Sequence, residues 1–262
     1  MNVRRLEAMR AAGSPIVGLT CYDAAFARLL SDCGVDLLLV GDSLGMVLQG
    51  AESTLPVTVD EVVYHTRCVA AGGGPALIVS DLPFGSYQAS PQQAFASAAR
   101  VVAAGAQVVK LEGGALMAPT VEFLSQRGVP VCGHIGLTPQ SVHQYGGYVL
   151  QGRDEDAVAR LIADAIALQE AGARMLVLEM VPAPVGRVIR EAVTVPVIGC
   201  GAGPDCDGQV LVLHDMLGIS RPPLPRFVRD FAAGGGGVGD AVRRYVEAVR
   251  ARSFPATAES YP

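Results

Sequence analysis

The stretch Val108-Val109-Lys110-Leu111-Glu112-Gly113-Gly114 carries the pattern that decides the fold. It begins as an apolar run too short for a helix and ends in charged residues and glycine, which is typical of a buried parallel strand. Side chains alternate between the two faces of a strand, so Lys110 and Glu112 share one face while Val109 and Leu111 share the other. The apolar face has to pack on helices. The charged face is therefore predicted to look into the mouth of a barrel.

Seven further short apolar runs occur along the chain, and helical patterns lie between most of them. One helix is expected from Asp154, because apolar residues follow at helical spacing after an acidic first turn, and Gly172 ends the pattern. Capping sequences at Thr58–Glu61 and Ser90–Gln93 begin two others. Strands that alternate with helices predict an α/β protein, a (β/α)8 TIM barrel, with a doubly wound open sheet as the alternative. The eight predicted strands are Ile16–Thr20, Val35–Val40, Ala76–Ser80, Val108–Glu112, Val129–Gly133, Met175–Glu179, Val195–Gly199 and Val210–Leu213.

The chain of 262 residues is long enough for one such barrel and contains no internal linker. We therefore expect a single domain over residues 1–262, with a short N-terminal segment over 1–15. A glycine-rich break at Gly234–Gly237 precedes a helix predicted from Asp240 to about Arg252. Residues 240–262 are thus expected to form a C-terminal helix and a polar tail.

The composition narrows the class of protein. Half of the residues are apolar and 17% are charged, which excludes intrinsic disorder. The net charge of -5 and the lack of a basic run give no reason to bind nucleic acid. No run reaches the ~18 apolar residues of a spanning helix, and the N-terminus lacks the apolar core of a signal peptide, so no membrane partner is expected. The six scattered cysteines fit a reducing compartment, and we expect a cytoplasmic protein.

Ionisable residues stand at the ends of five successive predicted strands, where a (β/α)8 barrel places its chemistry. These positions are Asp42, Asp81, Glu112, His134 and Glu179. The first three are hard oxygen donors without clustered histidine or cysteine, a set that suits Mg²⁺ better than Zn²⁺. The two oxygens of an α-keto acid are at the right separation to chelate such an ion. The position of His134 at a strand end suggests that it orients substrate or shuttles protons, so it is included among the substrate-binding candidates.

Lys110 is the only lysine in a chain with 19 arginines. Because the two residue types are not interchangeable at a tight site, Lys110 is predicted to act there. It would place a fixed positive charge near a substrate carboxylate or a developing enolate. A simple ion pair with Glu112 and a Schiff base, as in class I aldolases, are the alternatives. Competing motifs fail, since Gly199–Pro204 lacks the last glycine of a dinucleotide-binding loop and no P-loop or G-x-S-x-G motif occurs.

Several sequence blocks strongly resemble the ketopantoate hydroxymethyltransferase family, over nearly the whole chain from about Thr20 to Phe254-Pro255. The Gly-Asp-Ser-Leu-Gly-Met block within them is highly specific. The blocks are Val40–Met46, Gln49-Gly50, Ser53–Thr58, Asp81–Phe84, Val109–Gly114, Gly133–Gln140, Gly201–Gly203 and Asp207–Gln209. The chain departs from the family in a short segment ahead of the first strand and in the tail Ala258–Tyr261, where a histidine is expected before the serine. Both departures concern packing between subunits or over the site mouth.

The resemblance implies a barrel of the phosphoenolpyruvate/pyruvate-binding type, one Mg²⁺ per subunit and a homodecamer of two pentameric rings. It implies a transferase that moves a hydroxymethyl group from 5,10-methylenetetrahydrofolate to 3-methyl-2-oxobutanoate through a Mg-stabilised enolate, giving 2-dehydropantoate in pantothenate biosynthesis. By motif, the metal-site acids correspond to Asp42, Asp81 and Glu112, the keto-acid-binding residues to Asp42, Ser43, Asp81 and Lys110, and the proton acceptor to Glu179.

Two other functions stay open on the sequence alone. One is a related barrel lyase or mutase that cleaves a C–C or C–P bond of a keto acid and needs no folate. The other is a non-catalytic protein that binds a metal ion and a keto acid.

Overall fold

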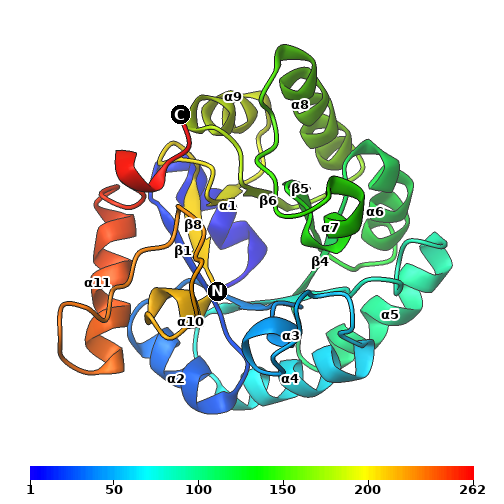
Figure 1. Cartoon of the computed structure of the whole chain (residues 1–262). Coiled ribbons are helices and arrows are strands. Elements are labelled where there is room, and N and C mark those ends of the chain that lie inside the picture. Colours follow the sequence, from blue (N-terminus) through cyan, green and yellow to red (C-terminus); the bar gives the residue numbers. More distant parts are fainter.

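The computed structural model describes residues 1–262, and its eight strands close into a parallel barrel in sequence order (Figure 1). Each strand pairs in parallel with the next, and the last pairs with the first, which confirms the predicted barrel and excludes the open sheet. The strands are β1 (Ile16–Thr20), β2 (Leu37–Val40), β3 (Leu77–Asp81), β4 (Val108–Glu112), β5 (Val131–Gly136), β6 (Met175–Glu179), β7 (Val197–Cys200) and β8 (Gly208–Leu211).

Helices surround the barrel and connect all but one pair of successive strands (Figure 1). The α-helices are α1 (Val3–Ala11), α2 (Ala24–Asp32), α3 (Leu44–Val47), α4 (Val59–Gly72), α5 (Pro91–Ala103), α6 (Ala118–Ser125), α7 (Val142–Tyr145), α8 (Glu155–Glu170), α9 (Ala183–Ala192), α10 (Leu213–Met216) and α11 (Val238–Arg250). Short 3₁₀ turns lie at η1 (Ala115–Met117), η2 (Pro139–Ser141) and η3 (Thr257–Glu259). Only the connection between β7 and β8 lacks a helix. No helix has the length and apolar character needed to cross a membrane.

The barrel interior and the space under the helices form two separate apolar clusters. The larger contains 55 buried residues, among them Val109 and Leu111, and lies between the sheet and the helices. The smaller contains 13 buried residues from inside the barrel, among them Val108. Val108 and Lys110 therefore point to the same side of β4, into the barrel, as the alternation of side chains predicted.

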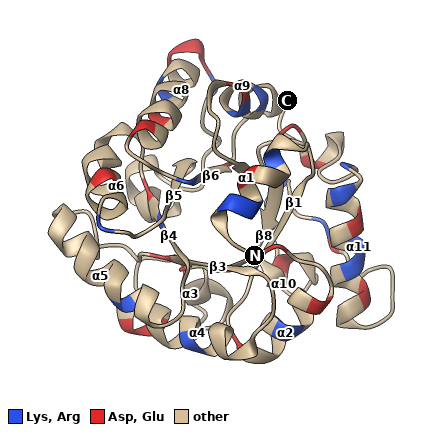
Figure 2. Ribbon diagram, turned by 180° about the vertical axis from the view of Figure 1, so that it is seen from behind, with Lys and Arg blue, Asp and Glu red and all other residues tan.

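Helix α1 closes the amino-terminal end of the barrel, and Figure 2 shows it across the middle of the ring. Its buried residues Leu6 and Met9 belong to the interior cluster, together with residues at the starts of the strands. Arg10 fixes the helix through an ion pair of 3.0 Å with Asp207. The sequence predicted a short N-terminal segment over residues 1–15, and the structure shows that helix α1 forms most of it.

Several strand boundaries differ from the predicted ones. The predicted strand 129–133 is Val131–Gly136, so His134 lies within β5 rather than after it. The predicted strand 210–213 is Gly208–Leu211. Glycine explains the shift of β8, because a Cβ at Gly208 would lie only 2.3 Å from the carbonyl oxygen of Ile16, a close approach that a search for apolar runs misses. Helix α11 also begins and ends two residues earlier than the predicted helix over 240–252.

The closure of the barrel by α1 can be tested with Leu6→Ala. Leu6 is fully buried, so its truncation should lower the free energy of unfolding by about 2–5 kcal/mol. Arg4→Ala, at an exposed position of the same helix, should change it by no more than about 0.5 kcal/mol. Urea denaturation measures both values. Equal effects of the two substitutions would show that α1 contributes no core.

Candidate active site

The carboxyl ends of β2 to β6 bring the predicted site residues together above the apolar interior of the barrel. Asp81 ends β3, Lys110 and Glu112 lie on β4, and His134 lies on β5. These four side chains are all buried. Asp42, which follows β2, is also buried, and Glu179 ends β6 with 17% of its side chain exposed. The structure thus unites the six ionisable groups that sequence analysis selected.

Lys110 lies at the centre of this layer. Its Nζ is 3.0 Å from Oδ1 of Asp81 and 3.3 Å from Nδ1 of His134. Burial lowers the pKa of Lys110, but the charges of Asp81, Glu112 and Asp42 outweigh it, so that the net shift is upward. The amine therefore stays protonated. Because a Schiff base forms from the neutral amine, the structure favours the fixed positive charge over the Schiff-base alternative.

His134 bridges two carboxylates on neighbouring strands. Its Nδ1 is 3.3 Å from Oε1 of Glu112, and its Nε2 is 3.2 Å from Oε2 of Glu179. Burial and the charge of Lys110 lower the pKa of His134, whereas the hydrogen bonds to Glu112 and Glu179 raise it, and the net result is a pKa of about 9. The ring thus lies between the two acids, with one nitrogen near each.

Asp42 is tied to its neighbours through both its backbone and its side chain. Its N–H donates to Oδ2 of Asp81 over 2.9 Å, and its Oδ2 accepts from Nε2 of Gln140 over 2.9 Å. Burial raises the pKa of Asp42 well above its ordinary value, and repulsion from Asp81 and Glu112 adds to the rise. Three carboxylates that repel one another surround a single ammonium, so a further positive charge would stabilise the site.

Ser43 follows Asp42 and is held by a residue that sequence analysis did not select. Its Oγ is 2.9 Å from the hydroxyl of Tyr22, which lies just after β1 and is buried. Burial raises the pKa of Tyr22, so the phenol stays neutral. The signal for Tyr22 was its place directly after a predicted strand, but it carries no charge at neutral pH and so did not join the series of ionisable strand ends.

The donor set fits a hard divalent cation. All candidate ligands are carboxylate oxygens, and apart from its contact with Lys110 the buried Oδ1 of Asp81 has no hydrogen-bond partner. No three histidine, cysteine or carboxylate side chains have the mutual spacing that would hold a metal by themselves. Mg²⁺ does not require this, since it is commonly bound by one or two carboxylates and completes its shell with water and substrate oxygens. Asp42 and Asp81 are the pair of carboxylates best placed to bind Mg²⁺.

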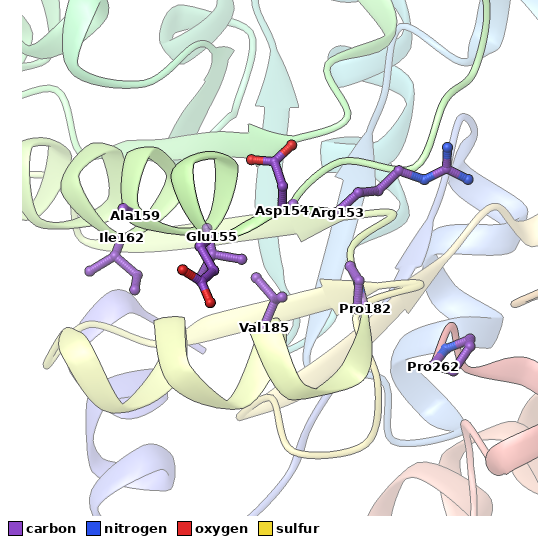
Figure 3. Close-up of a pocket in the computed structure, with 10 residues that line it drawn as sticks. Arg153, Asp154, Glu155, Ala159, Ile162, Pro182, Val185 and Pro262 are labelled. Carbon is purple, nitrogen blue, oxygen red and sulfur yellow. The ribbon is translucent and has the colours of Figure 1, made fainter.

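A groove on the surface lies elsewhere. Figure 3 shows it between α8 and α9, with Ile162 and Val185 on its walls and Pro262 at one end. It encloses about 550 Å³. None of the clustered acids, nor Lys110 or His134, lines it. The chemistry of the barrel mouth, rather than the size of a groove, therefore identifies the candidate site.

The C-terminal tail, where the sequence departs from the family pattern, lies beside this mouth. The backbone N–H of Ala183, four residues after Glu179, donates to the carbonyl oxygen of Tyr261 over 2.9 Å. Glu259 anchors the tail through an ion pair of 2.6 Å with Arg229. The altered tail thus packs against the loop that follows the predicted base.

A closed α/β barrel with its titratable groups gathered at the carboxyl ends of the strands has the architecture of a barrel enzyme. Comparison with known proteins identifies the kind of enzyme. The sequence profile of the ketopantoate hydroxymethyltransferase family matches residues 1–257, and the chain belongs to this family. Membership makes it a transferase and sets aside the non-catalytic binding protein.

Close relatives support the assignment. The chain is 58% identical over 261 residues to a 3-methyl-2-oxobutanoate hydroxymethyltransferase from Thiobacillus denitrificans, covering 100% of this chain and 99% of the relative. It is 60% identical over 257 residues to the same enzyme from an Azoarcus species, covering 98% and 95%.

Solved structures support the fold. Phosphonopyruvate hydrolase, in complex with oxalate and Mg²⁺, aligns over 97% of this chain and 98% of its own, with a TM-score of 0.61 and 12% identity. The phosphoenolpyruvate phosphomutase of Streptomyces platensis subsp. rosaceus aligns over 82% of both chains, with a TM-score of 0.62 and 15% identity. These similarities confirm the TIM-barrel fold.

The position of Glu179 can be tested through Gly136, its partner across the β5–β6 pair. A Cβ at Gly136 would lie 2.2 Å from the carbonyl oxygen of Glu179, and the residue has φ of +88°. Gly136→Ala should therefore displace the end of β6, reduce turnover and destabilise the protein. Gly128→Ala is the control, because it has φ of +82° with nothing within 4 Å of the added carbon.

Both substitutions incur the cost of the left-handed backbone, but only Gly136→Ala adds the clash. The difference in unfolding free energy should be about 1–3 kcal/mol, measured by urea denaturation. If the two variants lost equal stability and kept equal turnover, the close packing of Gly136 on Glu179 would have no consequence.

Proposed function

We propose that this enzyme transfers a hydroxymethyl group from 5,10-methylenetetrahydrofolate to 3-methyl-2-oxobutanoate, giving 2-dehydropantoate on the route to pantothenate. The observation that carries the proposal is the pairing of a buried, charged Lys110 with Asp81 while Glu179 stands partly exposed on the next-but-one strand. Removal of the proton on C3 of an α-keto acid needs two separate groups. A fixed positive charge has to stabilise the developing enolate, and a separate carboxylate has to take the proton.

The keto acid would bind over Lys110 and beside Asp42, Ser43 and Asp81. The ammonium of Lys110 attracts the substrate carboxylate, and Tyr22 orients the hydroxyl of Ser43 toward the mouth. Asp42 and Asp81, with Glu112, would hold one Mg²⁺ per subunit. When bound, this ion would withdraw electrons from the keto oxygen and stabilise the enolate charge as a Lewis acid.

Glu179 would act as the base. Its Oε2 lies 3.2 Å from Nε2 of His134, and 17% of the side chain is exposed, so the carboxylate is accessible to the C3 proton. A positioned general base contributes a factor of about 10²–10⁴ to the rate. His134 in this scheme lies between the acids on both sides. The enolate carbon then bonds to the methylene carbon of the donor, a water molecule supplies the hydroxyl oxygen, and the two carbon–nitrogen bonds of that methylene group break to release tetrahydrofolate.

The rim of the barrel mouth carries exposed apolar side chains that suit a flat aromatic donor. Large apolar side chains are exposed on the loops that follow β2, β3, β4 and β5, namely Leu48, Phe84, Leu116 and Tyr148. Tyr148 reaches from the β5 side to the β2 side, where its hydroxyl contacts the sulfur of Met46 over 3.5 Å. Such a rim suits the pterin and aminobenzoyl rings of a folate.

The assembly belongs to the same proposal. The family resemblance supports a homodecamer of two pentameric rings in the cytoplasm, with small molecules as the substrates.

Turnover with and without the folate donor tests the proposed function. Purified protein with Mg²⁺, 3-methyl-2-oxobutanoate and 5,10-methylenetetrahydrofolate should form 2-dehydropantoate, detected by mass spectrometry. Omission of the donor or addition of EDTA should abolish the product, and Mg²⁺ should restore it after EDTA. Consumption of the keto acid without the donor would identify a lyase or mutase instead, and activity in EDTA would remove the metal from the scheme.

The role of Glu179 is tested by Glu179→Gln, which keeps the shape of the side chain but cannot take a proton. The variant should still bind the keto acid, yet exchange of its C3 hydrogen in D₂O, followed by proton NMR, should slow by about 10²-fold or more. Glu122→Gln, at an exposed position of α6, should exchange at the rate of the unchanged protein. Near-normal exchange in the Glu179 variant would assign the base elsewhere.

A further inference from the structure

Gln140 is a buried residue of the site to which the proposed function gives no role. It lies in η2, directly after β5, and is 5% exposed. Its backbone N–H donates to Oε2 of Glu112 over 2.9 Å. Its side-chain Nε2 donates to Oδ2 of Asp42 over 2.9 Å and to the carbonyl oxygen of Leu82 over 3.0 Å. One residue thus holds two acids that stand on different strands.

The other end of the same amide is fixed by Tyr87. The hydroxyl of Tyr87, itself buried, donates to Oε1 of Gln140 over 2.6 Å. The same hydroxyl oxygen accepts the backbone N–H of Glu112 over 3.1 Å. A second donor, Nε2 of Gln88, approaches Oε1 over 3.1 Å.

The direction of this hydrogen-bond chain is set by the backbone. Because the N–H of Glu112 can only donate, the Tyr87 oxygen accepts there. Its single proton goes to Oε1 of Gln140 at 2.6 Å, which is closer than the alternative acceptor, the carbonyl oxygen of Glu112 at 3.3 Å. An amide oxygen and an amide NH₂ have nearly the same shape, so only their partners decide which way the group faces. With Oε1 held by Tyr87, Nε2 has to face Asp42 and present a donor to its carboxylate.

We propose that Gln140, oriented by Tyr87, is a positioning residue that fixes the carboxylates of Asp42 and Glu112 for binding a divalent cation. The donor on Oδ2 of Asp42 holds the carboxylate in one rotamer and leaves Oδ1 free of hydrogen bonds. The backbone N–H of the same residue fixes Glu112. The inference rests on the proposed metal-dependent function, because it needs Asp42 to face a cation.

The test measures binding of Mn²⁺, a spin-active substitute for Mg²⁺, by the electron paramagnetic resonance signal of the free ion, without turnover. Gln140→Leu removes the amide at similar volume and should weaken Mn²⁺ binding by about 10–100-fold, as loss of such a supporting hydrogen bond commonly does. Tyr87→Phe removes only the hydroxyl and should weaken binding by a smaller factor, since Gln140 can then rotate. The double variant should bind as weakly as Gln140→Leu alone, because Tyr87 acts through Gln140.

Tyr245→Phe is the matched control. Tyr245 is also buried, its hydroxyl donates to the backbone carbonyl of Gly18 over 2.9 Å, and it lies on α11. Removal of the Tyr245 hydroxyl should reduce thermal stability and leave Mn²⁺ affinity unchanged. Circular dichroism confirms folding, and if Gln140→Leu fails to fold, the comparison of Tyr87→Phe with Tyr245→Phe decides.

Each result has a distinct meaning. Unchanged Mn²⁺ affinity in folded Gln140→Leu, or equal affinity in Tyr87→Phe and Tyr245→Phe, overturns the positioning role and leaves the proposed function intact. If the losses of Mn²⁺ affinity in the two single variants multiply in the double variant, Tyr87 does not act through Gln140. Failure of the unchanged protein to bind Mn²⁺ overturns the metal part of the proposed function, and the positioning role with it.

Discussion

The ion pair between Lys110 and Asp81 is the interaction on which the rest of the site depends. An ammonium and a carboxylate removed from water cost several kcal/mol each unless they are paired and hydrogen-bonded. Lys110 is accordingly surrounded by acids, and each of those acids has a donor of its own from a neighbouring strand or loop. The donors are His134 for Glu112 and Glu179, Gln140 for Asp42 and Glu112, and the N–H of Asp42 for Asp81. Loss of any one partner would leave a buried charge uncompensated, so this layer of charges is stable only when all partners are present.

The lower half of the barrel makes this layer possible. Leu6 and Met9 of α1 complete an apolar interior beneath the charged residues, and Arg10 secures the helix to Asp207. Water is thereby excluded from below, so the charges interact through a medium of low effective dielectric constant. The low dielectric constant that makes an unpaired charge costly there also strengthens every polar interaction with a substrate bound at the mouth.

Sequence alone predicted the barrel and the gathering of charged side chains at its mouth, because both follow from local rules. A two-residue spacing places Lys110 and Glu112 on one face, and the ends of parallel strands meet at one mouth. Helix α1 escaped prediction because its fold is decided by contact with strand starts far along the chain. The roles of Tyr87 and Gln140 escaped because they depend on hydrogen bonds across 53 residues of sequence, and neither residue carries a charge that marks it. His134 was found, but its place within β5 was not predicted.

The position of His134 explains how the proposed base Glu179 and the ammonium of Lys110 can coexist a few ångströms apart. Direct contact between Lys110 and Glu179 would form an ion pair, in which neither group would act on a substrate. His134 stands between them, with Nδ1 3.3 Å from Nζ of Lys110 and Nε2 3.2 Å from Oε2 of Glu179. The imidazole occupies the space that such a pair would need, and its contact with Glu112 keeps the ring in place. A buried imidazole beside a buried ammonium has a cost in stability, as active sites commonly do, and it keeps the two groups separate and rigid.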